Sequence, residues 1–380
     1  MALSPEERSD LRTSARALLA RASSSDAVRA VVADSPGFDR ALWDQMVELG
    51  WTSIHVDPEH GGGGAGYADL AVILHELGRA IVPSPFLASA VLTNAALSLA
   101  DNGLGSELRA ALTAGDSTGS VALASTDGSY EASRLSTEWT RSGAALSLRG
   151  SAGFVLDADV ADVLVIAARG ADDAPAFVAV DTSTPGLRVH PAPTVDATRR
   201  LFTVDFDEVA VPEDRLLCEP GGRAGELLAQ TVAVGAIAAA ADAMAVAERA
   251  LEGAAEYAKT RMQFGKPIGT FQAVKHHCAN MAIAVEASRA AVRAACDALD
   301  GDPRCWPTTA AVTASYVGPA CAEACGLALR VHGGIGFTWE HDAHLHLKRV
   351  KLDEVLFGTP SWHRRRLART LIDDEETRNR

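Results

Sequence analysis

The stretch Arg261-Met262-Gln263-Phe264-Gly265-Lys266-Pro267-Ile268-Gly269-Thr270-Phe271-Gln272 lies where one long predicted helix ends and the next begins. It combines a cation, an aromatic residue, a turn glycine and a glutamine. Later in the chain, Arg330-Val331-His332-Gly333-Gly334-Ile335-Gly336-Phe337 forms a Gly-Gly-x-Gly bend at the end of another helix. A planar guanidinium can hold a diphosphate through two hydrogen bonds, and a helix N-terminus adds backbone donors. Arg261 alone would suit a surface cation at a helix end, but the first stretch as a whole, with Gln272 at the next helix start, favours a phosphate ligand.

Long segments with helical periodicity surround these stretches. We predict helices over 225–259, 271–299 and 308–331, and apolar residues cover the first of them on all sides. A helix that is apolar all round is buried, so 225–259 is expected inside a helical bundle. Its most apolar part, 232–241, is cut short by Asp242, and we expect it to be too short and too charged to span a bilayer.

The first third of the chain also has helical patterns. Ser4-Pro5-Glu6-Glu7 is expected to start a helix, with its serine as N-cap and its second glutamate closing a capping box. Apolar residues at helical spacing predict a helix over 38–49, and another is expected to start near Tyr67. Between them, the four glycines 61–64 lack the strand and the Gly-Lys-Ser/Thr of a phosphate loop, so a flexible turn is expected.

The middle of the chain changes to short runs with the alternation of β-strands. Glycine, aspartate, serine and proline separate these runs, which lie at 120–124, 145–149, 162–167, 176–180 and 201–206. This pattern predicts a compact β domain of barrel or sandwich type.

Several segments together resemble the acyl-CoA dehydrogenase family. They are the two stretches quoted above, LGWTSIHVDPEHGGGGAGYADLAVILHELGRAIVPSPF at 49–86 and VDFDEVAVPEDRLL at 204–217. The resemblance covers nearly the whole chain and implies an α+β fold with three domains. We expect an N-terminal α-helical domain over 1–116, a middle β-barrel or sandwich domain over 117–218, and a C-terminal four-helix bundle over 219–380.

In this family the two C-terminal stretches hold the pyrophosphate and adenosine of FAD across a subunit interface. The resemblance implies that the cofactor-binding residues here are Arg261, Gln263, Phe264, Phe271, Gln272, Arg330, Gly333 and Gly334. Arg330 stands where relatives usually carry glutamine, so whether it contacts FAD stays open. The paired glycines also suit a helix C-cap, and that role is compatible with close approach of a nucleotide.

Dehydrogenation of an acyl thioester needs a carboxylate to take the α-proton, a flavin to accept the hydride, and donors on the thioester carbonyl. In most relatives the carboxylate precedes a Gly-Thr pair, but here the segment reads Val355-Leu356-Phe357-Gly358-Thr359. Other relatives carry the base on the first long C-terminal helix, at the position of Gly235. Neither phenylalanine nor glycine can accept a proton, so no catalytic residue is assigned.

Two other carboxylates could replace the missing base. Asp242 follows Gly235 by seven residues, on nearly the same helix face but ~10 Å along the axis. Glu354 precedes Phe357 by three residues and would share its face if that segment were helical. Each has a structural alternative, which is a buried helix end or interface ion pair for Asp242 and a solvated face for Glu354.

The β domain differs from the family as well. Relatives that bind flavin there have a Thr-Glu-Pro-x-x-Gly-Ser-Asp-like loop, whereas this chain has Ala122-Leu123-Ala124-Ser125-Thr126-Asp127-Gly128-Ser129. A later Gly-Ser/Thr-Lys-x-aromatic strand becomes Gly150-Ser151-Ala152-Gly153-Phe154, which keeps the aromatic residue and loses the lysine. The contacts to a subunit's own flavin ring are therefore eroded, while those that reach a neighbour are mostly intact.

This asymmetry is expected of a chain that pairs with a homologous catalytic chain. It resembles the actinobacterial heterotetrameric acyl-CoA dehydrogenases, in which two related chains share a flavin site, as does the tail WEHDAHLHLKRVKLDEVLFGTPSWHRRRLA at 339–368. The resemblance implies an α2β2 complex with FAD that acts on bulky acyl-CoA thioesters of steroid side chains. A self-sufficient dehydrogenase with a relocated base and a non-redox subunit that binds CoA esters are the alternatives.

The charge of the chain limits the classes of molecule that it is expected to bind. The net charge of −14 and the pI near 5.2 argue against nucleic acid or an anionic membrane as a general partner. CoA would need a local basic patch, and Arg364-Arg365-Arg366 is either a solvated helix face or such an attraction site. The cluster His341, His344 and His346 lacks a completing cysteine or carboxylate frame, so no metal is predicted.

Cysteine usage and the N-terminus bear on the compartment. The six cysteines contain no Cys-x-x-Cys pair, and Cys321 and Cys325, one helical turn apart, are expected to be small buried residues. The N-terminal residues lack a basic segment followed by an apolar run. Reduced thiols and a cytoplasmic location are therefore expected.

Overall fold

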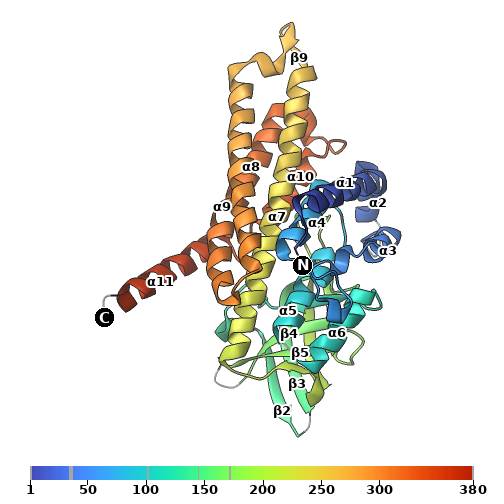
Figure 1. The fold of residues 1–380 in the computed structure, drawn as a ribbon, viewed down its shortest axis with the longest axis vertical. Coiled ribbons are helices and arrows are strands. Elements are labelled where there is room, and N and C mark those ends of the chain that lie inside the picture. The colour runs from blue at the N-terminus through green and yellow to red at the C-terminus, as the bar shows by residue number, and fades with distance from the viewer. Residues whose placement is uncertain (1, 34–36, 101, 144, 171–172, 379–380) are drawn as a thin grey trace. The chain divides into compact units, whose positions relative to one another are not determined.

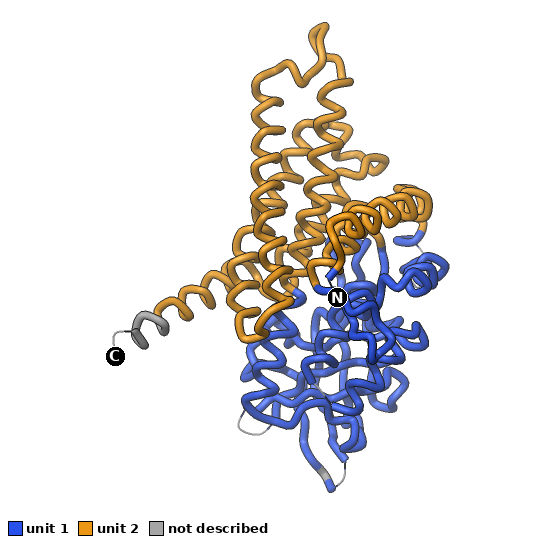
Figure 2. The backbone as a smooth tube through the Cα atoms, viewed as in Figure 1, with its two compact units in different colours: residues 1–2, 31–66, 83–235 blue, residues 3–30, 67–82, 236–380 orange. Residues whose placement is uncertain are grey.

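The computed structural model describes residues 2–33, 37–100, 102–143, 145–170 and 173–378 (Figure 1). They form two compact units, the first comprising residues 1–2, 31–66 and 83–235 and the second residues 3–30, 67–82 and 236–380 (Figure 2). The order of elements along the chain is helical, then β, then helical, as the sequence predicts.

The N-terminal third of the chain is helical, as the sequence predicts. Their bounds are α1 Pro5–Ala22, α2 Ser25–Ala33, α3 Arg40–Glu48, α4 Tyr67–Arg79, the π-helix η3 Phe86–Thr93, α5 Asn94–Ala100 and α6 Gly103–Ala114. The predicted capping box of α1 is present, because the Ser4 hydroxyl accepts from the Glu7 N–H at 3.2 Å and the Glu7 carboxylate accepts from the Ser4 N–H at 2.7 Å. Helices α3 and α4 begin within two residues of the predicted positions.

The four glycines 61–64 form a closely packed loop and no phosphate cradle. The N–H groups of Gly62, Gly63 and Gly64 are all bonded to backbone carbonyl oxygens of the preceding residues 53–57. A Cβ added to Gly62 would lie 2.1 Å from the Val56 carbonyl oxygen, so only glycine allows this approach.

The middle of the chain forms one eight-stranded sheet in the first unit. Its strands are β1 Gly119–Ala122, β2 Thr137–Ser142, β3 Ala145–Leu156, β4 Val163–Arg169, β5 Pro175–Asp181, β6 Leu187–Ala192, β7 Leu201–Pro212 and β8 Leu216–Cys218. Their order is β6-β7-β3-β2-β4-β5-β8, with β1 pairing parallel to β4. A single residue pair, Glu138 with Arg169, joins β2 to β4, so the sheet consists of two halves.

The two halves of the sheet share one core. Leu146 and Leu148 of β3 pack in the same buried cluster as Leu164 and Ile166 of β4, and none of the four is more than 1% exposed. Side chains from both halves that meet in one core make the sheet fold over itself, as the prediction of a barrel or sandwich requires.

The C-terminal part contains three long helices and two shorter ones. They are α7 Gly222–Thr260, α8 Gln272–Leu299, α9 Trp306–His332, α10 Ala343–Asp353 and α11 Pro360–Arg378. Of the described residues, only those of α7 form a helix long and apolar enough to cross a membrane, and 89% of its most apolar window is buried. The sequence prediction that this segment is too short was therefore wrong, but the burial is that of a core helix.

Three cysteines of the long C-terminal helices, Cys296, Cys321 and Cys325, are buried thiols that form no disulfide. Cys321 and Cys325 of α9 are at most 1% exposed, as predicted from their spacing. Burial raises the pKa of Cys296 and of Cys321 to about 12, so both thiols are neutral.

An ionic network joins α1, α4, α7 and α8 within the second unit. The His75 imidazole lies between two carboxylates, 3.0 Å from Glu76 and 2.5 Å from Glu248. Arg16 donates to Glu76 at 2.8 and 2.9 Å, and Arg289 lies 3.3 Å from Glu248. Because both ring nitrogens face carboxylates, the network is satisfied only when His75 is an imidazolium.

The pKa shifts in this network have opposite signs. Burial lowers the pKa of His75, but the hydrogen bonds to Glu248 and Glu76 outweigh it, and the pKa is raised above 6.5. Burial raises the pKa of both glutamates, but the hydrogen bonds from His75 and the nearby arginines outweigh it and lower each pKa to about 2. The contribution of His75 to folding stability is thus complete below pH 6.5 and is lost as pH rises through its raised pKa. The contributions of Glu76 and Glu248 are complete above pH 4.5 and are lost as pH falls toward their pKa of about 2.

We therefore expect His75→Gln to lower the free energy of unfolding most between pH 4.5 and 6.5, by about 1.5–3 kcal/mol. The difference from wild type should shrink as pH rises toward 9. Urea unfolding across this pH range measures it, with the exposed His276→Gln on α8 as control. A difference that does not depend on pH would contradict the imidazolium bridge.

Candidate functional site

The stretch at 261–272 forms a hairpin between α7 and α8 (Figure 1). Strands β9 Met262–Gln263 and β10 Lys266–Pro267 pair antiparallel, and the two residues between them have positive φ, +52° at Phe264 and +75° at Gly265. Positive φ at both central residues is the geometry of a type I′ turn, whose twist suits a two-residue hairpin. The fold thus holds Phe264 in a conformation that non-glycine residues rarely adopt.

The predicted site residues of this hairpin are presented to solvent. Phe264 is 89% exposed, and Arg261, Gln263 and Gln272 are also exposed. The Phe264 and Phe271 rings pack edge to face at 6.0 Å, and the Lys266 ammonium lies 4.6 Å from the Phe271 ring centroid. An aromatic residue fixed in place and left exposed is typical of a contact to another molecule.

Arg261 has no polar partner for its side chain among the described residues. Its side chain makes no hydrogen bond or ion pair with the described residues, while its backbone N–H and C=O bond to Tyr257 and Ile268 at 2.8 and 2.9 Å. Gln272 is the first residue of α8, with Phe271 as N-cap and no side chain bonded to the first N–H groups. Both features leave donors available for an anion.

The second predicted stretch ends α9. Gly333 caps the helix with φ +65° and ψ −142°, a conformation that is essentially restricted to glycine, and its N–H bonds to the carbonyl of Arg330 or Leu329. The predicted C-cap is therefore present. Gly333 and Gly334 are exposed, and a Cβ at either would meet nothing within 4 Å, so their backbone is open to a ligand. Arg330 is exposed as well.

A stack of aromatic rings connects the residues next to the stretches at 261–272 and 330–337. The Tyr257 ring of α7 stacks on His332 of α9 with centroids 4.9 Å apart, and His332 lies 4.3 Å from the ring of His341. Tyr257 is one helical turn before Arg261, and His332 directly precedes Gly333, so the stack brings the predicted stretches to one region of the second unit. Sequence reasoning missed this stack, because no periodic pattern signals it.

The position of the expected base is filled by a buried aromatic residue. Phe357 is 4% exposed and has φ +60°, in the turn that joins α10 to α11. Gly235 lies in the buried part of α7. Neither position presents a group that can take a proton.

Asp242 is held in a buried ion pair. Its two carboxylate oxygens accept from Arg349 of α10 at 2.8 Å from Nε and 3.2 Å from Nη2, and both residues are 4% exposed. A carboxylate held by two charge-assisted hydrogen bonds is strongly stabilised as the anion and is a poor proton acceptor. The structure favours the ion-pair role over that of a relocated base.

Glu354 and Phe357 do not lie on one continuous helix. Helix α10 ends at Asp353, so Glu354 is its C-cap and the next residues form turns. The Glu354 carboxylate accepts from Lys351 at 2.8 Å, and its side chain packs against Gly318 of α9. The condition for its role as a base, a continuous helix, is not met.

The loop at 122–129 uses its own hydrogen-bonding groups. The Ser125 hydroxyl donates to the Asp127 carboxylate, which also accepts from the Ser129 N–H at 3.1 Å. The hydrogen bond from Ser125 lowers the pKa of Asp127, which keeps it ionised, and Arg134 pairs with it. Phe154 stands beside this loop at Gly128, 44% exposed and with φ +55°.

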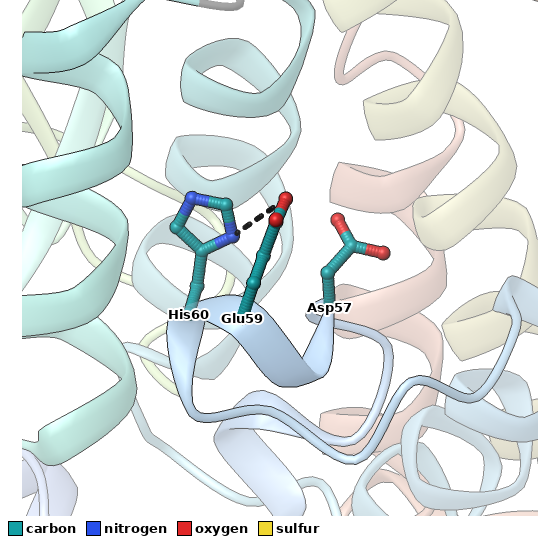
Figure 3. A group of neighbouring side chains, drawn as sticks. All are labelled: Asp57, Glu59 and His60. Atoms are coloured by element: carbon teal, nitrogen blue, oxygen red, sulfur yellow. Dashed lines mark ion pairs between the residues drawn. The ribbon is translucent and has the colours of Figure 1, made fainter.

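One group of side chains has ligand atoms close enough to share a metal ion. Among the described residues, the ligand atoms of Asp57, Glu59 and His60 lie within 4.8 Å of one another, around the short turn in Figure 3. Arg109 already donates to the Asp57 carboxylate at 3.3 Å, and both acids are exposed. We assign no metal to this group.

Comparison with known proteins agrees with this arrangement. The profile for the acyl-CoA dehydrogenase N-terminal domain matches residues 5–106, and that for the acyl-CoA dehydrogenase C-terminal domain matches residues 225–372. The chain is 34% identical over 364 residues to the acyl-CoA dehydrogenase IpdE2 of Mycobacterium tuberculosis, covering 96% of each. It is 34% identical over 375 residues to FadE34 of the same organism, covering 96% of this chain and 48% of that protein.

Solved structures give the same result. A structure of a Tcur3481-Tcur3483 steroid ACAD variant has a TM-score of 0.88 and 27% identity, and covers 98% of this chain and 99% of its own. The ChsE4-ChsE5 complex from Mycobacterium tuberculosis has a TM-score of 0.87 and 26% identity, and covers 97% and 98%. The chain therefore belongs to the acyl-CoA dehydrogenase family, flavoprotein oxidoreductases that act on CH–CH bonds.

Proposed function

We propose that this chain is the base-less subunit of a heteromeric FAD-dependent acyl-CoA dehydrogenase, assembled as α2β2 with a homologous catalytic chain in the cytoplasm. One observation carries the proposal. The groups that would reach a neighbour's cofactor are exposed, and the Arg261 side chain makes no polar contact with the described residues. The two positions at which the family carries its catalytic base hold Phe357 and Gly235.

The exposed residues suit a dinucleotide. Arg261 offers a guanidinium without a partner among the described residues, the N-terminus of α8 at Gln272 offers backbone N–H groups, and Gly333 and Gly334 leave room for close approach. In this proposal Arg261 holds the pyrophosphate, Phe264, Phe271 and Gln263 flank it, and Arg330 lies on the adenosine side. FAD, when bound, supplies the hydride acceptor of the dehydrogenation.

The missing carboxylate assigns proton abstraction to the partner. Phe357 occupies the base position with an apolar ring, Asp242 is held by Arg349, and Glu354 is the C-cap of α10. The role of this chain is then to bind and orient the cofactor and to complete the walls of a shared site. Because Asp242 is paired with Arg349 and Glu354 caps α10, neither carboxylate is a good candidate for the relocated base that a self-sufficient enzyme would need.

The substrate class rests on relatives. A similar structure is named a steroid ACAD, and both similar complexes pair two differently named chains. We propose a bulky acyl-CoA thioester, such as one of a steroid side chain, as the substrate.

Co-expression with a homologous chain that carries the missing glutamate tests the proposal. The complex should be yellow and should oxidise acyl-CoA, whereas this chain purified alone should be colourless and inactive. Replacing the partner's glutamate with glutamine should abolish turnover and leave the flavin bound. A yellow, active homo-oligomer of this chain would reject the proposal, and a colourless complex that binds acyl-CoA would support a non-redox role instead.

A further inference from the structure

A cavity of about 520 Å³ lies in the second unit between α1, α4, α7 and α8, and no residue of the hairpin or of the Phe357 turn lines it. The charged residues of its lining are six basic ones and two acidic ones, namely Arg8, Arg12, Arg16, His75, Arg289 and Arg293, with Glu248 and Asp297. In a chain with a net charge of −14, this is an unusual concentration of arginine.

Carboxylates outside or at the edge of the cavity hold three of its arginines in place. Asp69, which is fully buried, accepts from Arg8 Nε at 2.5 Å. Glu76 holds Arg16, and Glu248 lies 3.3 Å from Arg289. A guanidinium has five N–H donors, so an arginine fixed by one carboxylate keeps donors for a second anion. Arg8 uses only its Nε among the described contacts.

The other two arginines make no polar contact within the described parts of the chain. Arg12 of α1 and Arg293 of α8 are exposed, and neither makes a hydrogen bond or an ion pair with the described residues. Asp297, on the same helix as Arg293, also lines the cavity but forms no ion pair with either arginine. The guanidinium donors of both arginines are therefore available to an anion in the cavity.

Apart from Ser9 of α1, the rest of the lining is apolar. It consists of Pro5 of α1, Ala68, Ala71 and Val72 of α4, Ala241 and Met244 of α7, and Val292 and Cys296 of α8. Val72, Met244 and Cys296 are each at most 5% exposed, and the Cys296 thiol is neutral at pH 7. An apolar floor below a cationic rim favours a ligand with an anionic group and an apolar body.

We propose that this cavity binds a small organic phosphate. Arg12 and Arg293 hold its phosphate groups, with Arg8 adding donors, and its apolar part, such as a nucleoside base, lies on the floor. Arginine forks match phosphate geometry, and the volume is in the range of small-molecule sites. Free nucleotides and the phosphate end of coenzyme A share this chemistry. The proposal does not depend on the flavin role of the chain.

Calorimetric titration of the full chain, alone or in complex with its partner, with ADP, inorganic pyrophosphate, coenzyme A and adenosine tests the site. We expect ADP to bind, and Arg12→Gln and Arg293→Gln each to weaken it by about tenfold and the double variant by about a hundredfold, because each removes charge-assisted hydrogen bonds. Arg21→Gln, an exposed arginine at the end of α1 outside the cavity, is the matched control. None of these three arginines makes a hydrogen bond or an ion pair with the described residues, so unfolding curves should be unchanged.

The other ligands separate the parts of the proposal. Pyrophosphate should bind more weakly than ADP, which shows that the apolar floor contributes, and coenzyme A binding as tightly as ADP would identify it as a source of the phosphate. ADP binding must survive Arg261→Gln, which separates this cavity from the proposed flavin site. No saturable binding of any phosphate, unchanged ADP affinity in the double variant, or an equal loss in Arg21→Gln would each overturn the site, as would adenosine binding as tightly as ADP.

Discussion

Asp242→Asn is expected to lower the free energy of unfolding by about 3–5 kcal/mol, because it removes the negative charge that accepts two hydrogen bonds from the buried Arg349 guanidinium. The loss of this charge pairing in a buried position is the costly step, and the asparagine removes no volume that would explain such a loss. Urea unfolding followed by circular dichroism measures the change.

A matched double replacement separates charge from packing at this site. Asp242→Leu with Arg349→Met removes both charges and keeps apolar volume, and it should be much less destabilising than either single change. If Asp242→Asn were as stable as wild type and abolished turnover in the complex, the carboxylate would be a base and the ion-pair assignment would be wrong.

Arg261→Gln is expected to weaken flavin binding in the proposed heteromeric complex on the order of a hundredfold, because it would remove the two charge-assisted hydrogen bonds that we propose between this side chain and the pyrophosphate. The fold should be unaffected, since the side chain is exposed and makes no contact with the described residues. Flavin absorbance after gel filtration and fluorescence titration of the apo complex measure the loss.

Lys259→Gln provides the control for this experiment. Lys259 is an exposed cation near the end of α7 that pairs with Glu256, so it changes net charge equally without removing the proposed contact. Equal flavin affinity in wild type and Arg261→Gln would reject the proposed role of the hairpin, whether or not the complex turns over.

Elements with a strong apolar period could be predicted from the sequence, and the others could not. Helices α7, α8 and α9 begin and end within three residues of the predicted bounds, because their buried faces repeat every turn. Strand β6 was not predicted, because its alternation of Leu187 and Val189 with Arg188 and His190 is short and runs into Pro191, which weakens a strand pattern. Strand β2 was not predicted because its short sequence Thr-Glu-Trp-Thr-Arg-Ser is mostly polar.

Some features of the candidate site could also be predicted from the sequence, and others could not. The capping glycine at 333 follows from its place at the end of a periodic segment, and the structure has it there. The positive φ of Phe264 and the stacking of Tyr257 on His332 depend on tertiary packing, which no local pattern encodes. The partner of Asp242 lies 107 residues away, so only the fold reveals that its carboxylate is engaged.

The self-bonded loop at Ser125, Asp127 and Ser129 also bears on how the proposed base-less subunit could acquire turnover of its own. A glutamate at position 357 would supply a proton acceptor but would leave these donors turned toward Asp127. Under the proposed function, conversion to an independent enzyme would therefore require changes in two separate parts of the chain. Neither change alone would supply both missing parts, so the proposed subunit would stay dependent on its proposed partner.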